Sequence, residues 1–159
     1  MLMQVIDNDI TYMRMAINMA HQAARENEVP VGAVIVHKDR VIARAYNQVE
    51  LLKDPTAHAE IIAITQAASA LENWRLLDTV LYVTKEPCPM CAGAIVQARI
   101  PRVVWAMTDP LRGGGRSLFN ILQCKALNHH VEICSGILEE DGKDLLQTFF
   151  QKKRITGPS

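Results

Sequence analysis

The stretch VLYVTKEPCPMCAGAIVQARIPRVVWA, residues 80–106, holds two apolar runs on either side of a closely spaced pair of cysteines. The runs at 80–84 and 102–106 predict buried strands, and the second has the β-branched composition that parallel sheets favour. Residues 88–98 between them predict a helix. The two cysteines therefore stand at the beginning of a helix that follows a buried strand.

The flanking sequence continues this alternation of strands and helices. Residues 32–36 and 41–45 enclose a polar turn at 37–40 and predict a β-hairpin. The other predicted elements are helices at 9–26, 56–71, near 118–124 and at 139–153, and a strand near 131–134. Alternation after the hairpin favours an α/β fold in which a mixed sheet lies between helical layers.

Length and composition indicate an ordinary globular protein. The 159 residues are expected to form one domain, 1–159, long enough to bury a full core. The start of the chain lacks the basic and apolar segments of a signal peptide, and no apolar run approaches the length of a membrane span. We therefore expect a cytoplasmic protein with reduced thiols, whose paired cysteines bind metal or act in redox chemistry.

The charges balance, with 17 basic and 17 acidic side chains. With no net charge, the chain as a whole does not attract nucleic acid electrostatically. An RNA-binding surface would have to come from local clustering or from oligomerisation.

The pair Cys88 and Cys91 is ambiguous when taken alone. It could be two small packed side chains, a redox dithiol or half of a metal site. A structural zinc ribbon would need a second pair at the same spacing, and the sequence has none. Cys124 and Cys134 lack ligand spacing and are expected to be free thiols.

His58 and Glu60 form a second weak signal. A lone histidine in a helix is usually packed or solvated, and a residue two positions later does not share its helical face. The objection is weaker at a helix entrance, which Asp54 and Pro55 signal here. There both side chains can turn toward one point.

The two signals together are far more specific. His58, Cys88 and Cys91 provide three ligands, the catalytic zinc arrangement that leaves a fourth position open, so we expect one Zn²⁺ per chain. A helix N-terminus stabilises anionic sulfur, and zinc lowers the pKa of bound water to about 7. Glu60 is the carboxylate expected to move the proton. The combination His-x-Glu with Pro-Cys-x-x-Cys is the signature of the zinc deaminases.

Longer segments carry a closer resemblance. Residues 29–34, 54–60 and 81–94 closely resemble the bacterial tRNA-specific adenosine deaminases, and the similarity continues into 128–132 and 149–154. The resemblance implies a three-layer α/β/α, cytidine-deaminase-like fold with a central mixed five-stranded sheet. It also implies conversion of adenosine to inosine at the wobble position of an arginine tRNA. The expected partners are the tRNA anticodon stem-loop and a second copy in a homodimer, with no DNA and no membrane.

The resemblance also implies roles for individual residues. Asn47 matches a residue that hydrogen-bonds the flipped base, the backbone of Ala59 lies beside the same purine, and the N–H of Cys88 faces the reacting centre. Asp109 and Asn128 match positions that contact anticodon-loop nucleotides. Without the resemblance, Asn47 and Asp109 would be interpreted as ordinary turn residues.

Two regions need separate comment. Relatives often carry a basic residue shortly after the position of Asp109, whereas this chain has Leu111 there, followed by Arg112. The Gly113–Gly115 loop is also richer in glycine than expected, and both differences put the contacts of this loop with RNA in question. At the other end, Lys152, Lys153 and Arg154 could simply favour the C-terminal helix dipole or could contact RNA phosphates. We expect both, with the neighbouring aromatic residues docked on the protein.

Three other functions remain open at this stage. A free nucleobase or nucleoside deaminase, acting on guanine or cytosine, would use the same zinc ligands. A noncatalytic RNA-binding subunit could keep zinc for folding, and a zinc-stabilised scaffold is the plainest alternative. Glu60 speaks against a purely structural site, which does not need it.

Overall fold

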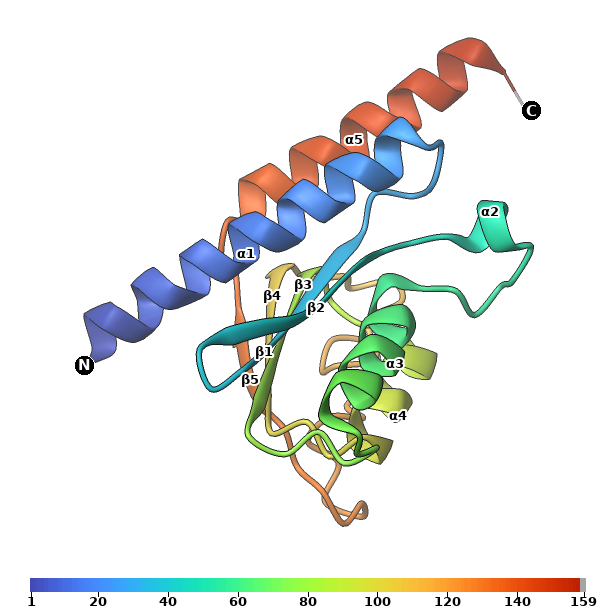
Figure 1. Cartoon of the computed structure of the whole chain (residues 1–159). Helices are drawn as coiled ribbons and strands as arrows, with labels where there is room; N and C mark the ends of the chain where they lie inside the picture. The colour runs from blue at the N-terminus through green and yellow to red at the C-terminus, as the bar shows by residue number, and fades with distance from the viewer. Residues whose placement is uncertain (158–159) are drawn as a thin grey trace.

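The computed structural model describes residues 1–157 and contains one five-stranded sheet (Figure 1). Its strands are β1 (Gly32–His37), β2 (Arg40–Tyr46), β3 (Thr79–Lys85), β4 (Arg102–Met107) and β5 (Glu132–Ser135), in the spatial order β2-β1-β3-β4-β5. β1 pairs antiparallel with β2 and β3, whereas β3–β4 and β4–β5 are parallel. The expected mixed sheet of five strands is therefore confirmed.

Helices cover both faces of this sheet, which confirms the predicted three layers. The helices are α1 (Leu2–Arg25), α2 (Val49–Leu52), α3 (Ala59–Leu71), α4 (Pro89–Gln97) and α5 (Glu139–Thr156). α1 and α5 lie side by side on one face, and α3 and α4 lie on the other (Figure 1). Among the described residues, no helix combines the length and the apolar character needed to cross a membrane.

The alternation of side chains along β1 explains why both faces are covered. Ala33 and Ile35 belong to the core under α3 and α4, whereas Val34 and Val36 belong to the core under α1. Successive side chains of a strand point to opposite faces, so an apolar run buries both faces only between two helical layers. The continuous apolar runs of β3 and β4 follow the same rule.

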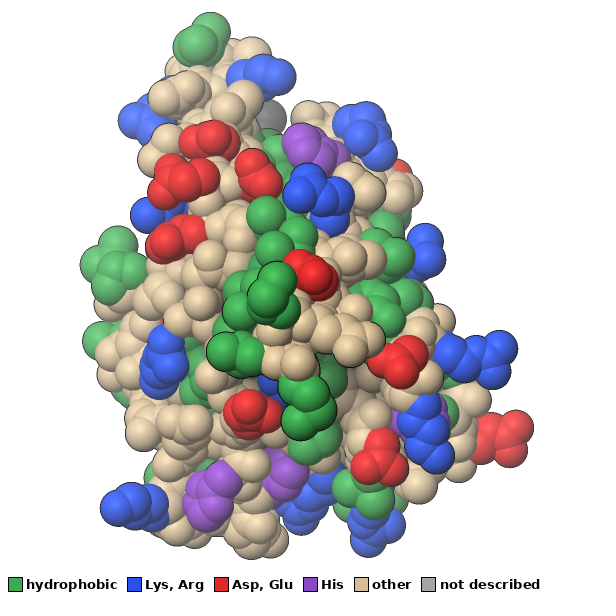
Figure 2. All heavy atoms as spheres, turned by 90° about the vertical axis from the view of Figure 1, so that its left-hand side faces the viewer, with side chains coloured by type: hydrophobic (Ala, Val, Ile, Leu, Met, Phe, Trp, Pro, Cys, Tyr) green, Lys and Arg blue, Asp and Glu red, His purple; other side chains and the backbone are tan. Residues whose placement is uncertain are grey.

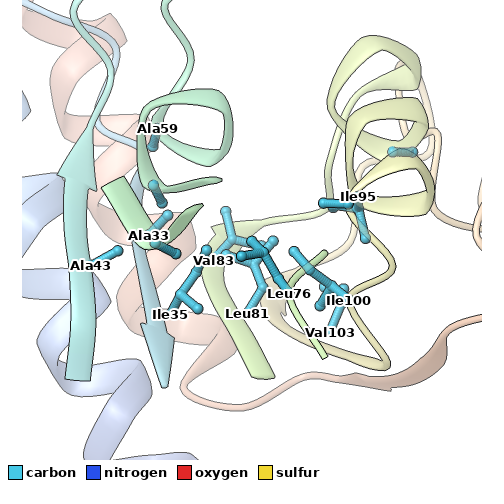
Figure 3. Close-up of a cluster of buried hydrophobic side chains, with 14 of the residues drawn as sticks. Ala33, Ile35, Ala43, Ala59, Leu76, Leu81, Val83, Ile95, Ile100 and Val103 are labelled. Atoms are coloured by element: carbon cyan, nitrogen blue, oxygen red, sulfur yellow. The ribbon is translucent and has the colours of Figure 1, made fainter. Parts of the chain in front are cut away.

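The larger core lies between the sheet and the α3–α4 layer (Figure 3). Leu81, Val83 and Val103 come from the parallel strands, and Ile95 comes from α4. All four side chains are fully buried. This core fixes the beginnings of α3 and α4 relative to the end of β3, which is where the predicted ligands lie.

α1 approaches the sheet most closely at Gly32. A Cβ at this position would lie 2.0 Å from the carbonyl oxygen of Ala16, which is a severe clash with backbone. The N–H of Gly32 donates to the hydroxyl of Thr84 at 3.2 Å. Glycine is needed here because the helix backbone occupies the space of a side chain.

The predicted short helix near 118–124 was wrong. The N–H groups of Leu118 and Phe119 both donate to the carbonyl of Gly113, and the N–H of Ile121 donates to Gly114. The segment forms turns that fold back on the glycine loop. Its N–H groups are used by the loop and not by carbonyls one helical turn earlier, so no helix forms.

Several predicted boundaries also need correction. α1 begins at Leu2 and not near residue 9, and α5 continues to Thr156. α3 begins at Ala59 and not at Thr56, because the Asp54 side chain accepts from the backbone and hydroxyl of Thr56 and holds a turn there. The short helix α2 was not predicted from the sequence.

Candidate active site

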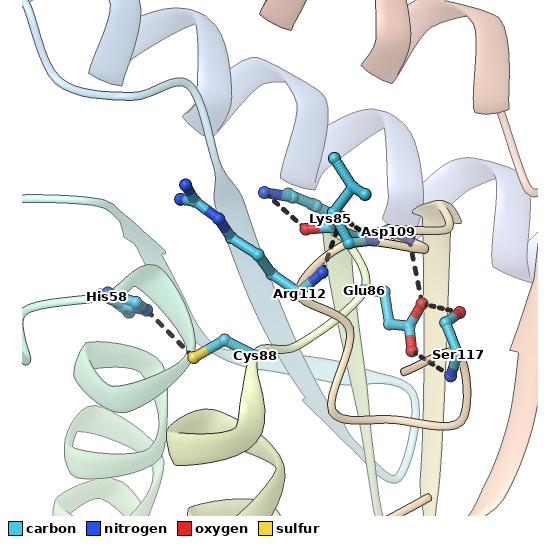
Figure 4. A network of polar contacts seen from close by, with 8 residues as sticks. His58, Lys85, Glu86, Cys88, Asp109, Arg112 and Ser117 are labelled. Carbon is cyan, nitrogen blue, oxygen red and sulfur yellow. Dashed lines mark hydrogen bonds and ion pairs between the residues drawn. The ribbon is translucent and has the colours of Figure 1, made fainter. Parts of the chain in front are cut away.

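The predicted ligands gather where two helices begin beside the end of β3 (Figure 4). His58 is the N-cap of α3, and Cys88 is the N-cap of α4, each with extended backbone geometry. Pro89 occupies the first turn of α4, where its missing N–H costs nothing. Both helix N-termini therefore direct positive potential toward one point.

The distances in this group fit a tetrahedral metal. His58 Nδ1 lies 3.6 Å from Cys88 Sγ and 3.5 Å from Cys91 Sγ, and all three ligand atoms lie within 4.8 Å of one another. Zn–S bonds of about 2.3 Å and Zn–N bonds of about 2.1 Å at tetrahedral angles separate nitrogen from sulfur by about 3.6 Å. Within residues 1–157, this is the only such group of three His, Cys, Asp or Glu side chains.

The two thiols differ in their tendency to ionise. Contacts from the Cys91 thiol and then from His58 lower the pKa of Cys88 to about 4. The same contact with Cys88, together with burial, raises the pKa of Cys91. Cys88 therefore ionises more readily than Cys91, and a cation at this point would favour the thiolate form of both, as expected for metal ligands.

Glu60 lies on the first turn of α3 and is 3% exposed. Its Oε1 atom is buried and finds no hydrogen-bond partner among residues 1–157. Burial raises the pKa of this carboxyl above the ordinary glutamate value. A buried carboxyl oxygen without a partner is costly for stability, which points to a functional role for the group.

His58 and Glu60 line the same pocket, of about 240 Å³, although they are two positions apart. The N-cap position explains this, because the backbone of His58 is extended and only Glu60 is helical. Cys88 lines the pocket as well. The sequence objection to the His-x-Glu pair therefore does not apply at this helix entrance.

Asn47 forms part of the pocket wall. Its side-chain oxygen accepts the N–H of Ala59 at 2.8 Å, and the residue is 8% exposed. Ala59 is fully buried, so it supports the wall through its backbone. The structure thus brings Asn47 and Ala59 together with the group formed by His58, Cys88 and Cys91.

Asp109 also lines the pocket, but its carboxylate is already held by the protein. Lys85 Nζ lies 3.0 Å from its Oδ2, and the N–H groups of Leu111 and Arg112 donate to its Oδ1. The ion pair with Lys85 is the main reason that the pKa of Asp109 is lowered despite partial burial.

The remaining predicted contact residues are spread over the surface. Asn128 is exposed and accepts a hydrogen bond from Arg99 at 3.1 Å, outside the pocket. Lys153 lines the pocket, whereas Lys152 lines a groove between α1 and α5. Arg154 is exposed and lines neither.

The aromatic residues near the end of α5 are only partly docked. Phe149 is 8% exposed and packs on the protein, but Phe150 is 43% exposed. The two rings meet edge to face, and Lys153 Nζ lies 5.1 Å from the centre of the Phe149 ring. The expectation that both aromatic side chains dock was therefore wrong for Phe150, which follows Phe149 and faces away from the core.

The sequence interpretation gave no role in the pocket to five charged residues that line it, Glu28, Glu50, Lys85, Glu86 and Arg112. Glu28 accepts the N–H groups of Glu50 and Leu51 and so fixes α2 at the pocket mouth. Lys85, Glu86 and Arg112 lie on the other side. Only the closeness of Lys85 and Glu86 to Cys88 in the chain could have indicated their place.

Comparison with known proteins assigns the chain to a family. The MafB19-like deaminase family model matches residues 7–154. A tRNA-specific adenosine deaminase of Bacillus subtilis is 46% identical over 92% of this chain and 91% of its own length. A solved structure from a study of A-to-I editing by tRNA:A34 deaminases at the wobble position of transfer RNA has a TM-score of 0.83 and 41% identity, covering 86% of this chain and 99% of that one. A guanine deaminase structure from Bacillus subtilis has a TM-score of 0.59 and 41% identity over 62% of this chain and 63% of that one. Since the family model matches residues 7–154 and the Bacillus subtilis tRNA-specific adenosine deaminase is 46% identical over 92% of this chain, the chain belongs to the tRNA-specific adenosine deaminase family.

Proposed function

We propose that this chain is a zinc-dependent hydrolase that converts adenosine to inosine at the wobble position of a tRNA anticodon. The observation that carries the proposal is the placement of an unpartnered buried carboxyl, Glu60, beside three converging metal ligands. The similarity to tRNA-specific adenosine deaminases over 92% of the chain supports the choice of substrate.

In this proposal His58, Cys88 and Cys91 hold one zinc ion. A zinc ion with three protein ligands would supply a water that is activated at neutral pH and would stabilise negative charge on its oxygen. The N-termini of α3 and α4 favour the anionic form of the sulfur ligands. The backbone N–H of Cys88, at the N-cap of α4, is proposed to donate to the reacting centre.

Glu60 moves the protons in this scheme. It accepts one proton from the attacking water and delivers it to N1 of the adenine as the water oxygen bonds to C6. It then takes the remaining proton of that oxygen and delivers it to the amine, so that the C6–N bond breaks, ammonia leaves and C6 keeps the oxygen as the carbonyl of inosine. The raised pKa of this buried carboxyl suits a group that must both take and give a proton. The absence of a partner for Oε1 among the described residues leaves that atom free for this exchange.

The pocket suits a single splayed base. Its volume of about 240 Å³ lies below the range of about 300–1,000 Å³ usual for drug-sized ligands. Asn47 is proposed to hydrogen-bond the base, while its contact with Ala59 holds its side chain in place beside the purine. A base extruded from an anticodon loop can enter such a pocket without breaking a duplex.

RNA binding is proposed to rest on local groups, because the chain carries no net charge. Figure 2 shows basic and acidic side chains interspersed over one face, without a wide field of one sign. Arg112 and Lys153 place two cations at the pocket. Lys152, Arg154, Asp109 and Asn128 are proposed to contact the rest of the anticodon stem-loop. We also propose that the chain prefers arginine tRNA, forms a homodimer and is located in the cytoplasm.

The direct test is to sequence the wobble base of cellular tRNA with and without this protein. Inosine is read as guanosine, so the edited position should change with the presence of the chain. A strain carrying Glu60→Gln provides the matched control, because the protein is present and only the carboxylate is lost. Editing that is independent of the protein would contradict the proposal.

A further inference from the structure

Glu86, the residue that follows β3, has an arrangement that the proposed chemistry does not use. It is 2% exposed, and both of its carboxylate oxygens are bound. Oε1 accepts the N–H of Asp109 at 3.0 Å and the hydroxyl of Ser117 at 2.5 Å. Oε2 accepts the N–H groups of Arg116 and Ser117, each at 3.0 Å. One side chain thus receives four hydrogen bonds from the two ends of one loop, residues 109–117. Figure 4 shows Glu86 between Asp109 and Ser117.

Two of the three glycines of this loop, Gly113 and Gly115, approach the same carboxylate. A Cβ at Gly113 would lie 2.4 Å from Glu86 Cδ, and a Cβ at Gly115 would lie 2.8 Å from the Trp105 ring. The glycine-rich composition is therefore explained by the close approach of the loop backbone to a buried anion. A buried charge of this kind is stable only when donors surround it, and here the loop supplies them.

The loop also touches the turn that carries Cys88. The N–H of Gly114 donates to the carbonyl of Pro87 at 2.7 Å. A Cβ on Gly114 would lie 2.5 Å from the nitrogen of Pro89 and 2.7 Å from the carbonyl carbon of Cys88. The loop therefore rests directly on the beginning of α4.

Two residues of the loop, Asp109 and Arg112, line the pocket. Asp109 is held at the backbone by Glu86 and at the side chain by Lys85, so adjacent residues of one strand end fix it from two sides. Arg112 follows within the same turn, because its N–H donates to Asp109. Interactions that hold the loop backbone in place therefore also set the positions of Asp109 and Arg112 in the pocket wall.

We propose that Glu86 is a positioning residue, which clamps the loop 109–117 and so holds Asp109 and Arg112 in the geometry that receives the RNA around the target adenosine. The substrate part of this proposal rests on the function proposed above, whereas the clamp itself does not. The hydrogen bonds that the Glu86 side chain accepts all come from the loop, and none comes from His58, Cys88 or Cys91. Removal of Glu86 should therefore weaken substrate binding more than the chemical step.

The first test needs no substrate. Glu86→Gln keeps the size of the side chain but replaces one acceptor oxygen with a donor, which faces the N–H groups of the loop. We expect hydrogen exchange of the 109–117 amides in the zinc-loaded protein to accelerate about tenfold or more, with the zinc content unchanged. Ser117→Ala, which removes one of the four donors, should accelerate the same amides to a smaller extent.

The matched control is another buried carboxylate outside the pocket. Asp9 on α1 is 2% exposed and accepts hydrogen bonds from Tyr82 and from both terminal nitrogens of Arg102, each at 2.8 Å. It lies on the opposite face of the sheet from α3 and α4. Asp9→Asn should lower the melting temperature while leaving exchange in the loop unchanged.

The second test separates binding from chemistry. With an anticodon stem-loop as substrate, Glu86→Gln should raise KM about tenfold while kcat falls less than about threefold, and Ser117→Ala should change KM in the same direction. Asp9→Asn should leave KM unchanged. If Glu86→Gln does not fold, Ser117→Ala carries the test by itself.

The outcomes are distinguishable. Unchanged loop exchange, or loss of zinc in Glu86→Gln, would overturn the clamp, and an unchanged KM in both loop variants would overturn its role in substrate binding. If the wild-type protein does not act on the stem-loop but loop exchange accelerates as expected, the proposed function fails and the clamp stands.

Discussion

Nδ1 of His58 lies 3.5 Å from Sγ of Cys91, although 33 positions separate the two residues in the chain. Neither helix carrying them could create this contact alone. The core between the sheet and the α3–α4 layer sets the two helix beginnings side by side, and the His, Cys and Cys side chains then converge. The convergence of these three side chains is thus a consequence of helix packing on the sheet.

This convergence predicts one zinc ion per chain. Cys88→Ala and Cys91→Ala should each lose the metal, because two remaining ligands bind zinc far more weakly than three. Cys124→Ala is the matched control, since Cys124 is a free thiol outside the group of three. Metal analysis of the purified proteins measures the outcome, and full retention of zinc in both ligand variants would refute the assignment.

Replacement of Glu60 should separate metal binding from chemistry. Glu60→Ala and Glu60→Gln should keep zinc and lose deamination by a factor of about 10² to 10⁴, the usual contribution of a positioned acid–base group. Activity and metal content should be measured on the same samples. Substantial residual activity would contradict the proton-transfer role, and loss of the metal would mean that Glu60 is itself a ligand.

The site was predictable largely because its signals are local. Two cysteines at a predicted helix start and a histidine near another were enough to expect a three-ligand centre. The sequence could not show that Asp54 holds a turn around Thr56, which delays α3 until Ala59 and makes His58 its N-cap. That detail decides how a histidine and a glutamate two positions apart reach one pocket.

The cations near the end of α5 should contribute unequally to RNA binding. Lys153 lines the pocket and Lys152 lines a groove elsewhere, so Lys153→Glu should weaken binding of a tRNA anticodon stem-loop more than Lys152→Glu. Reversal of Lys152, Lys153 and Arg154 together should also flatten the salt dependence. Each lost phosphate contact lowers the slope of log affinity against log salt by about 0.7–0.9.

Titration of the stem-loop at several salt concentrations provides this measurement. The wild-type protein gives the reference slope, and the two single variants show which cation matters. If the triple variant keeps the wild-type slope, the basic residues only stabilise the end of the helix.

Gly32→Ala should destabilise the fold. The new Cβ would meet the carbonyl oxygen of Ala16 at 2.0 Å and the nitrogen of Ala20 at 2.5 Å, and helix backbone cannot move away without separating α1 from the sheet. We expect a loss of about 3 kcal/mol in the free energy of unfolding. Gly93→Ala is the control, because its Cβ would meet nothing within 4 Å and alanine favours the interior of α4. Denaturant titration compares them, and equal stability of both variants with the wild type would show that the contact at Gly32 is loose.

The parts of the structure that the sequence did not predict depend on contacts between distant segments. A short helix was predicted near 118–124, but N–H groups of this segment donate to the carbonyl groups of Gly113 and Gly114. The sequence did not predict a role for Glu86, because the four hydrogen bonds that its carboxylate accepts come from residues 23 to 31 positions later in the chain. Such pairings leave no periodic signal, and only the folded chain reveals them.

The most direct test of the account is a substrate panel with ammonia release as the readout. The zinc-loaded protein is given an arginine tRNA with adenosine at the wobble position, its isolated anticodon stem-loop, free adenosine, cytidine and guanine. We expect turnover of the tRNA, slower turnover of the stem-loop and little reaction with the free compounds, because contacts beyond the base help to position the reacting centre. Efficient conversion of guanine or cytidine together with an inert tRNA would contradict the proposed function.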